Sequence, residues 1–596
     1  MKSKGIKRVF SYMGRYKIRM IIGFIAAIVS TVFSVVAPVI LGSITTILYD
    51  GVIDGKWMAT DDVYFEWGDI QLGKVGTIFL IVVLLGLIYV VAWIFGTIAN
   101  SLFSNVAARV IQDLRDDIDE KMHRIKLNYY DTRTNGEILS VITNDVEAIN
   151  LALGKNLYNA VLQLFTLIGT IVMMFLVNIW LTLVAIAMVP VTIILSGGVL
   201  KASGKNFKKQ QDMLGELNGY VEEMYNGKDV VSSFNYQERS IEHFEEVNTN
   251  LQEVVRKSEL ASGSVMPVTQ MVNNLGYAVN ALIGCLLALN GSITVGNVQS
   301  MVQYTKSFNI PFTQLSLIAG QLTTANAAAH RVFELVDAEE EIPDPEMGKK
   351  PQQENGAVEF SHVQFGYVPG QTLMNDVSVS VKPGQKCAIV GPTGAGKTTL
   401  INLLMRFYEI GGGTITVDGV DTKQMTRHEL RRHFGMVLQD TWLFEGTIRD
   451  NLKYSTDRDV SEDEMEKATA SVCADGFIRT MPGGYDMVLS KGAENISQGQ
   501  RQLLTIARAI LANPEIMILD EATSNVDAHT EQVIQDAMAT LMKGRTSFVI
   551  AHRLSTIRDA DMILYMENGD IKEVGDHDEL MAKGGKYAAL YNSQFA

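Results

Sequence analysis

Residues 386–407 read KCAIVGPTGAGKTTLINLLMRF, and this stretch decides the fold of the C-terminal half of the chain. The apolar run CAIV is typical of a buried strand, and TLINLLMRF has the pattern of a helix. Between them, Gly391 to Thr398 matches the motif G-x-x-x-x-G-K-[ST] in full. Glycines let backbone N–H groups approach phosphate oxygens, and the helix N-terminus adds the positive end of its dipole. The stretch therefore predicts a phosphate-binding turn between strand and helix; the alternative is a chance match in a tight turn.

The motif assigns roles within this loop. Lys397 is expected to hold the β- and γ-phosphates of a nucleotide, and Thr398 a Mg²⁺ ion. ATP and Mg²⁺ are therefore the expected cofactors. The other nucleotide-binding residues that it predicts are Gly391, Thr393, Gly394, Ala395, Gly396 and Thr399.

A second motif, IMILDE at residues 516–521, is an apolar run that ends in two carboxylates. Asp520 is placed to hold Mg²⁺, and Glu521 is placed to act as general base on the attacking water. Alone, such an ending is also consistent with a surface strand terminus. Its position after the phosphate loop favours a catalytic role.

The residues around these motifs alternate short β-rich runs with helical patterns, which is typical of an α/β domain. Strands are expected at residues 357–363, 387–390, 434–438 and 515–519. The pair Asn568-Gly569, between ILYM and DIKEV, predicts a late hairpin.

The N-terminal half is organised by long stretches without Asp, Glu, Lys or Arg. These are residues 20–49, 75–108, 156–200 and 260–305. About 20 apolar residues cross a hydrocarbon layer of ~30 Å. The first two stretches hold one span each, and the last two, broken at Asn178 and Asn290-Gly291, hold two each. The sequence therefore predicts six membrane-spanning helices with both termini on one side.

Charge predicts which side that is. The first 19 residues carry Lys and Arg but no acidic residue, which is typical of a cytoplasmic segment. The loop after the first span is rich in Asp and Glu and is expected outside. We therefore expect a multi-pass protein of the plasma membrane whose N-terminus and ATPase domain are cytoplasmic, with long helical inner loops at roughly 109–155 and 201–259.

The domain boundaries follow from composition. The first domain is expected at residues 1–335, and a linker at 336–355, where acidic residues, Pro and Gly become frequent. The ATPase domain is expected at 356–596. The net charge of −15 gives no indication of nucleic-acid binding, and the three scattered cysteines predict neither a disulfide framework nor a metal site.

Residues 495–502, NISQGQRQ, resemble the LSGGQ signature of the ABC transporter superfamily, with Ile496 for Leu and Gln498 for the middle Gly. S-x-x-Q is a capping box, which predicts a helix N-terminus, and such a terminus is an anion site. The resemblance implies that this segment binds the γ-phosphate of ATP held by a partner, so that a site is complete only in a dimer. A plain helix cap is the alternative. The residues concerned are Ser497, Gln498, Gly499 and Gln500.

Other positions match the same family in order. Tyr367 resembles the aromatic residue that stacks on adenine, with a core strand residue as the alternative. Gln439 resembles the loop glutamine that senses Mg²⁺ and contacts the membrane domain. Asp527 resembles the acidic residue of the loop that links two ATP sites. His552 resembles the switch histidine that contacts the γ-phosphate, although a lone histidine after an apolar strand is more often structural.

The membrane half resembles ABC exporter half-transporters of the bacterial multidrug and lipid type, since six spans precede one ATPase domain. Residues 128–146 resemble their first intracellular loop, with a coupling tip near 131–136, and residues 234–236 resemble the second tip. Solvated helical turns are the alternative for both. The altered signature and the loose match at 488–494 resemble the sequence departures of heterodimeric exporters. In those proteins, one half keeps the catalytic glutamate and the other lacks it. Because this chain has Glu521, it would be the competent half; a homodimer remains open.

Polar side chains recur on one face of each of the last two expected spans. The fifth carries Gln270, Asn274 and Tyr277, and the sixth carries Gln303, Gln314 and Gln321. They predict either the wall of a transport pathway or helix–helix hydrogen bonds. Because the expected spans contain no carboxylate, a lipophilic or amphipathic small molecule fits better than a strongly charged one.

The resemblance implies ATP-driven export by alternating access, performed by one half of a dimeric transporter. A second half-transporter and the lipid bilayer are the expected partners, and no nucleic acid is expected. The alternative is an ATP-gated channel or regulatory subunit that binds nucleotide without pumping. An importer is disfavoured because its membrane and ATPase parts usually lie on separate chains.

Overall fold

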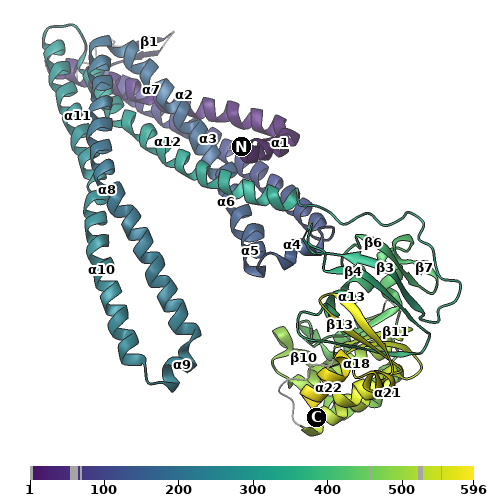
Figure 1. The fold of residues 1–596 in the computed structure, drawn as a ribbon. Helices are drawn as coiled ribbons and strands as arrows, with labels where there is room; N and C mark the ends of the chain where they lie inside the picture. Colours follow the sequence, from purple (N-terminus) through teal and green to yellow (C-terminus); the bar gives the residue numbers. More distant parts are fainter. Residues whose placement is uncertain are drawn as a thin grey trace. The chain divides into compact units, whose positions relative to one another are not determined.

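The computed structural model describes residues 4–53, 65–67, 70–368, 370–439, 441–456, 458–520, 528–551 and 553–595. The chain forms two compact units, coloured from purple to yellow along the sequence in Figure 1. The first comprises Met1–His123 and Thr134–Ala338, and the second comprises Arg124–Arg133 and Glu339–Ala596. The second unit thus includes a short segment from the N-terminal half.

Six helices of the first unit cover the charge-free stretches in which the sequence predicts spans. They are α2 (Lys17–Ile53), α3 (Lys74–Met122), α7 (Leu157–Val177), α8 (Ile179–Asn226), α11 (Val265–Leu289) and α12 (Val295–Val336). Asn178 separates α7 from α8, and its side chain accepts hydrogen bonds from the backbone N–H groups of Trp180 and Leu181. The predicted break at that residue is therefore confirmed.

Four continuous helical runs in the described part of the chain are long and apolar enough to cross a membrane. They are Gly5–Ile53, Lys74–Met122, Asn135–Val177 and Gln237–Leu289. Ile179–Thr192 is a shorter apolar helix. The total of six spans therefore stays a prediction, because α12 lies outside this set.

The first unit contains further helices and one strand pair. They are α1 (Lys4–Met13), α5 (Asn135–Ser140), α6 (Val146–Leu151), α9 (Lys228–Ser233) and α10 (Gln237–Gly263), with the strand pair β1 (Phe65–Trp67) and β2 (Ile70–Leu72). Helices α8 and α10 run side by side and are joined through α9, so they form one long helical arm (Figure 1). Most of the predicted acidic outer loop lies outside the described residues.

Helices α2 and α12 approach each other at two glycines. A methyl group on Gly296 would overlap the carbonyl oxygen of Gly42. Beside this crossing, the hydroxyl of Ser300 donates to the carbonyl of Pro38 (2.9 Å) and that of Tyr304 to the carbonyl of Val35 (2.5 Å). Small residues that allow such backbone contact are typical of helix packing within membranes.

The second unit is built on a six-stranded sheet of order β14-β13-β5-β12-β11-β8. Its strands are β5 (Lys386–Val390), β8 (Phe434–Val437), β11 (Ile516–Asp520), β12 (Thr546–Ile550), β13 (Met562–Glu567) and β14 (Asp570–Gly575). All neighbouring pairs are parallel except β13–β14. Alternate residues of β5 enter two different core clusters, so both faces of this strand are buried, as expected in a parallel sheet.

A four-stranded antiparallel sheet of order β4-β3-β6-β7 adds β3 (Val358–Phe365), β4 (Met374–Val381), β6 (Gly412–Val417) and β7 (Val420–Asp421). A two-stranded ladder pairs β9 (Gly446–Thr447) with β10 (Val488–Leu489). The helices of this unit are α4 (Leu127–Asp131), α13 (Lys397–Leu404), α14 (Arg427–Arg432), α15 (Ile448–Lys453), α16 (Glu462–Ser471), α17 (Asp475–Thr480), α18 (Gln498–Ala512), α19 (Ala528–Met542), α20 (Leu554–Arg558), α21 (His577–Lys583) and α22 (Lys586–Phe595).

The local predictions for this unit are largely confirmed. Each of the four predicted strands is present, with bounds shifted by at most two residues at either end. The late hairpin turns at Asn568-Gly569, where φ is +52° and +82°. The predicted linker is folded against the second unit, because the backbone N–H of Glu341 donates to the carbonyl of Arg124 and that of Lys349 to the carbonyl of Gln424, both at 2.8 Å.

We expect Gly296→Ala to lower the thermal stability of the protein, whereas Gly320→Ala on the same helix leaves it unchanged or raises it. The first methyl group meets the backbone of α2, and overpacking of this kind costs about 1–3 kcal/mol. The second meets no described atom within 4 Å and gains the helix preference of alanine. Thermal unfolding of both variants in one detergent checks this; equal midpoints would contradict the crossing at Gly42.

Candidate nucleotide site

Three parts of the predicted site lie at one edge of the six-stranded sheet. Strands β5, β12, β11 and β8 are parallel, so their carboxyl ends meet there. The phosphate loop follows β5, Asp520 ends β11, and Gln439 comes two residues after β8. In open α/β sheets, ligands bind at this edge. The structure therefore places these three parts of the prediction on the same side of the sheet.

The phosphate loop depends on its glycines. Gly391, Gly394 and Gly396 have φ values of +156°, +81° and +97°, in the region that glycine adopts without strain. A methyl group on Gly391 would also overlap the carbonyl oxygen of Met566. The β13–β14 turn supports the loop, because the backbone N–H of Gly569 donates to the carbonyl of Ala395 at 3.0 Å.

Lys397 is the first residue of α13 and is half-buried. Its ammonium group donates to the carbonyl oxygens of Gly391 (2.7 Å) and Pro392 (3.1 Å), which holds it over the loop. Burial lowers the pKa of Lys397, and the carboxylate of Asp520 acts in the opposite direction. A partly desolvated cation in this position interacts strongly with phosphate oxygens.

The oxygen donors fit a magnesium ion. Thr398 is exposed in the first turn of α13, and Asp520 is partly exposed at the end of β11. Carboxylate and hydroxyl oxygens are hard ligands of the kind that Mg²⁺ prefers beside nucleotide phosphates. Of the remaining loop residues, Thr393 and Gly394 are exposed and Ala395 is buried.

Tyr367 lies beside the helix of the phosphate loop. Its hydroxyl donates to the hydroxyl oxygen of Thr399 at 3.0 Å. Its ring packs edge-on against Phe365 and Tyr408, with centroids 4.8 and 5.0 Å apart. The side chain is 38% exposed, so a base can reach it. Its stacking on adenine stays a prediction.

The signature segment contains the helix start that the sequence predicts. Ser497 caps α18, and the capping box is present: the N–H of Gln500 donates to the Ser497 hydroxyl (3.2 Å) and the N–H of Ser497 to the Gln500 side chain (2.9 Å). Ser497 is exposed, Gln498 is partly exposed and Gly499 is buried. The segment therefore presents the positive end of a 15-residue helix at the surface of the unit.

Three predicted site residues lie outside the described residues. These are the expected general base Glu521, Asp527 and the expected switch residue His552. The strands that precede them, β11 and β12, end at Asp520 and Ile550 on the edge that carries the phosphate loop. Their roles stay predictions.

The first predicted coupling tip, residues 131–136, is divided between the units: 131–133 belong to the second unit and 134–136 to the first. Segment Arg124–Arg133 contains α4 and groups with the ATPase part. The phenol of Tyr408 donates to the carboxylate of Asp131, and Lys126 forms an ion pair with Glu339 (2.6 Å). Burial and Asp131 both raise the pKa of Tyr408. Through the Tyr408–Tyr367 contact, α4 is linked to the side chain that bonds Thr399.

Tyr408 was not among the residues that the motifs indicated, because its sequence context, MRFYEI, belongs to no nucleotide-binding motif. The second predicted tip lies between α9 and α10 in the first unit, where Phe234 is 79% exposed and Asn235 has φ of +50°. The role of both tips in coupling stays a prediction.

The polar residues of the expected pathway lie mostly at exposed positions of the first unit. Gln303 is partly exposed; the exposed residues are Gln270, Asn274, Tyr277, Gln314 and Gln321. Sequence reasoning missed Asn280 of α11, which is 2% exposed. Its amide donates to the carbonyl of Leu181 and the hydroxyl of Thr305, both at 3.1 Å. This asparagine joins three long helices and shows that helix–helix bonding also occurs in this region.

The fold and the site together define an ATP-hydrolysing membrane transporter. Two family models match the chain: the ABC transporter transmembrane region over residues 20–312 and the model described as ABC transporter over residues 374–524. The chain belongs to the ABC transporter superfamily and has the organisation of a bacterial exporter half-transporter. It binds ATP and couples its hydrolysis to the transport of a substrate.

Several characterised and uncharacterised relatives are similar to it. A fatty acid ABC transporter ATP-binding/permease protein of Mycobacterium tuberculosis is 44% identical over 476 residues, which are 80% of this chain and 75% of that protein. An uncharacterised ABC transporter ATP-binding protein of Bacillus subtilis, YfiC, is 37% identical over 99% of this chain and 94% of its own. A probable multidrug resistance ABC transporter ATP-binding/permease protein of the same species, YheH, is 34% identical over 82% of this chain and 72% of that protein.

We expect Lys397→Met to abolish ATP binding and hydrolysis, while Lys386→Met keeps both. The two lysines lie near opposite ends of the same strand–loop segment, but only Lys397 reaches the phosphate loop. Binding of a fluorescent ATP analogue and release of phosphate by the purified protein check this. Normal hydrolysis by Lys397→Met would contradict the assigned role.

We expect Tyr408→Phe to loosen α4 without changing the affinity for ATP. The ring packing is kept, and only the hydrogen bond to Asp131 is removed. Hydrogen exchange of the backbone amides in residues 124–133 should become several-fold faster. Tyr485→Phe, which removes a hydroxyl bonded to Thr469 and Asp475 elsewhere in the unit, serves as control and should leave this exchange unchanged.

Proposed function

We propose that this chain exports lipophilic or amphipathic small molecules across the plasma membrane, as one half of a dimeric transporter that works by alternating access. The observation that carries the proposal is the shared sheet edge, where the phosphate loop, Asp520 and Gln439 come together, in a chain that also contains long apolar helices of membrane type. The basic first 19 residues support a cytoplasmic N-terminus and therefore a cytoplasmic ATPase unit.

A dimer is supported by two exposed features. The N-terminus of α18, capped by Ser497, is an anion site at the surface of its own unit. In addition, the arm formed by α8, α9 and α10 exposes large apolar side chains, which proteins usually cover with a partner or with lipid. They include Phe207, Tyr225, Val230, Phe234 and Tyr236. In the proposed dimer, the signature of one half closes over ATP held by the other.

A heterodimer is favoured over a homodimer. Gln498 replaces the glycine of the family signature, whereas Glu521 is retained. In this arrangement the chain supplies the competent general base, and a second half-transporter supplies the other signature. Co-purification from the native membrane distinguishes the two cases: a second ATPase-bearing chain in equal amount supports the heterodimer, and a single chain species contradicts it.

The chemistry follows from the residues at the sheet edge. Lys397 and the loop N–H groups hold the phosphates, while Thr398, Asp520 and Gln439 bind or sense Mg²⁺. Glu521 acts on the attacking water, and His552 contacts the γ-phosphate and orients the carboxylate of Glu521. Closure of the two ATPase units pulls on the coupling tips and opens the transport pathway outward, and hydrolysis resets it.

The class of substrate is inferred from the spans and the relatives. The four long charge-free stretches contain no carboxylate or cation. Two relatives are named for fatty acids and for multidrug resistance, which are lipophilic or amphipathic cargoes. Gln270, Gln314 and the other polar residues on exposed faces of α11 and α12 are proposed to line the pathway.

A channel or regulatory subunit that only binds ATP is the competing proposal. ATP-dependent uptake of a labelled amphiphile into inside-out vesicles decides between them. Accumulation above the equilibrium level that requires hydrolysable ATP supports the pump. Equilibration that proceeds with a non-hydrolysable analogue supports the channel and would overturn the proposal.

We expect Glu521→Gln to reduce ATP turnover to background while ATP still binds. The substitution removes the base but keeps the shape of the side chain, so the nucleotide stays trapped in the closed dimer. Retained radiolabelled ATP after rapid desalting checks this, with Lys397→Met as the contrasting variant that retains none. Unchanged turnover would refute the assignment of the base.

A further inference from the structure

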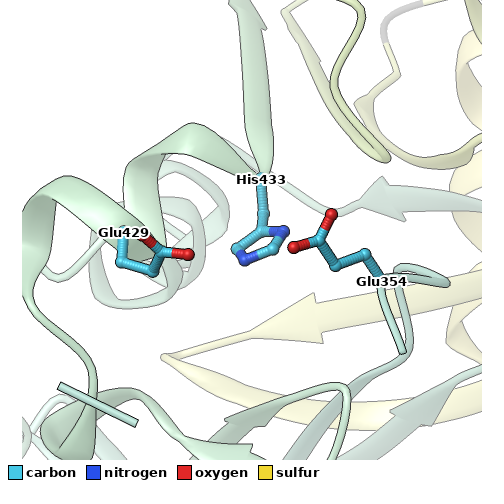
Figure 2. Close-up of side chains that lie close together, drawn as sticks. All are labelled: Glu354, Glu429 and His433. Carbon is cyan, nitrogen blue, oxygen red and sulfur yellow. The ribbon is translucent and has the colours of Figure 1, made fainter. Parts of the chain in front are cut away.

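A second cluster of metal-type ligands lies in the second unit, away from the nucleotide edge. Figure 2 shows the imidazole of His433 between the carboxylates of Glu354 and Glu429. The ligand atoms of the three residues all lie within 4.8 Å of one another. Glu354 precedes β3, Glu429 is the third residue of α14, and His433 joins α14 to β8.

His433 is the member that points to a ligand. Only 3% of this residue is exposed, and its Nε2 atom has no hydrogen-bond partner among the described residues. A buried polar atom left unpaired is costly and rare in folded proteins. The other ring nitrogen, Nδ1, lies 3.2 Å from a carboxylate oxygen of Glu515. If Nδ1–H donates to Glu515, the lone pair of Nε2 is left for a cation, as in the carboxylate–histidine–metal arrangement.

The other charged groups near the cluster are Lys350 and the cavity-lining residues His428, Arg431, Arg432 and Arg458. Lys350 contacts Glu429 at 3.1 Å, but its side chain is 67% exposed and is free to turn into solvent. Arg431 donates to the carbonyl of Met405, and Arg458 pairs with Glu464. Glu354, Glu429, His433 and Glu515 also line one open cavity of about 850 Å³, which gives access and space for water ligands.

We propose that Glu354, Glu429 and His433 form a binding site for a divalent transition-metal ion of the Zn²⁺ class, with Glu515 as the residue that orients the histidine. One imidazole and two carboxylates are donors that Zn²⁺ accepts, completed by water. Tetrahedral bonds of ~2.0–2.1 Å require ligand atoms about 3.4 Å apart. The ligand atoms lie within 4.8 Å of one another, and rotation of the exposed Glu354 side chain brings its carboxylate to the shorter distance. The metal ion then takes the place of the Lys350 ammonium group beside Glu429.

This ion is distinct from the magnesium of the nucleotide site. His433 precedes β8 and Glu515 precedes β11, whereas Gln439 and Asp520 mark the carboxyl ends of these strands. The four residues of β8 separate the two edges by about 13 Å at 3.3 Å per residue. The site fastens the segment before β3 to α14. The two residues that follow Glu354 are fixed by hydrogen bonds, because the N–H groups of Asn355 and Gly356 donate to the carboxylate of Asp418.

The test is metal binding by the full-length protein, purified without a histidine tag and treated with chelator. Zn²⁺ is added in a buffer with millimolar Mg²⁺, and bound metal is measured after equilibrium dialysis. We expect about one tightly bound Zn²⁺ per chain, with Mg²⁺ unable to displace it, because Mg²⁺ prefers oxygen ligands. No binding at micromolar free Zn²⁺ would overturn the proposal.

Isosteric variants locate the bound ion. Glu354→Gln changes an exposed carboxylate and should weaken Zn²⁺ binding at least tenfold, whereas Glu346→Gln, an exposed carboxylate of the same segment, should not. Glu515→Gln should weaken Zn²⁺ binding about 10–100-fold, because Glu515 acts only by orienting the imidazole of His433. X-ray absorption should report one nitrogen ligand among oxygens. Zn²⁺ affinity that is unchanged in both Glu354→Gln and His433→Gln would place the ion elsewhere and refute the site.

Discussion

The rest of the ATPase unit depends on one constraint: a run of backbone N–H groups must converge on a small volume at the end of a buried strand. Side chains at Gly391, Gly394 or Gly396 would prevent this, because their φ angles are positive and Gly391 lies against the Met566 carbonyl. The strand itself is fixed by burial on both faces, with alternate residues in separate cores. Because the neighbouring strands run parallel to β5, their carboxyl ends lie at the same edge of the sheet.

A network of side chains extends from this edge within the second unit. Thr399, on the helix of the phosphate loop, accepts a hydrogen bond from Tyr367, which packs on Tyr408, which in turn bonds Asp131 of α4. Together these contacts connect the helix that follows the phosphate turn with a segment that lies far away in the sequence. Contiguous packed and hydrogen-bonded side chains of this kind can carry energetic coupling between distant sites.

Much of this could be predicted from sequence because the deciding signals are local. The phosphate loop, the S-x-x-Q cap at Ser497, the turn at Asn568-Gly569 and the break at Asn178 each need only a few neighbouring residues to define their geometry. The charge-free stretches similarly reflect the length of chain that spans hydrocarbon.

What sequence reasoning missed depends on contacts between distant residues. Asn280 is an unremarkable polar residue until Leu181 and Thr305 are brought to it. The role of Tyr408 depends on its hydrogen bond to Asp131, which is distant in the sequence. The role of His433 likewise depends on its contacts with Glu354 and Glu515. The linker prediction followed composition, which cannot show that acidic residues such as Asp344 pair with Arg427. These features are set by tertiary packing, which no local pattern encodes.

The membership of Arg124–Arg133 in the second unit has a consequence for biosynthesis. This segment leaves the ribosome long before Tyr408 and Glu339, the residues that hold it. Domains generally fold in the order in which they are made. Here, however, α4 has to wait until the whole membrane half and the first sheets of the ATPase unit have been synthesised. In a truncated chain this segment therefore lacks the residues that it packs against. Incomplete molecules differ from finished ones by this unpacked segment, which cellular quality control can recognise.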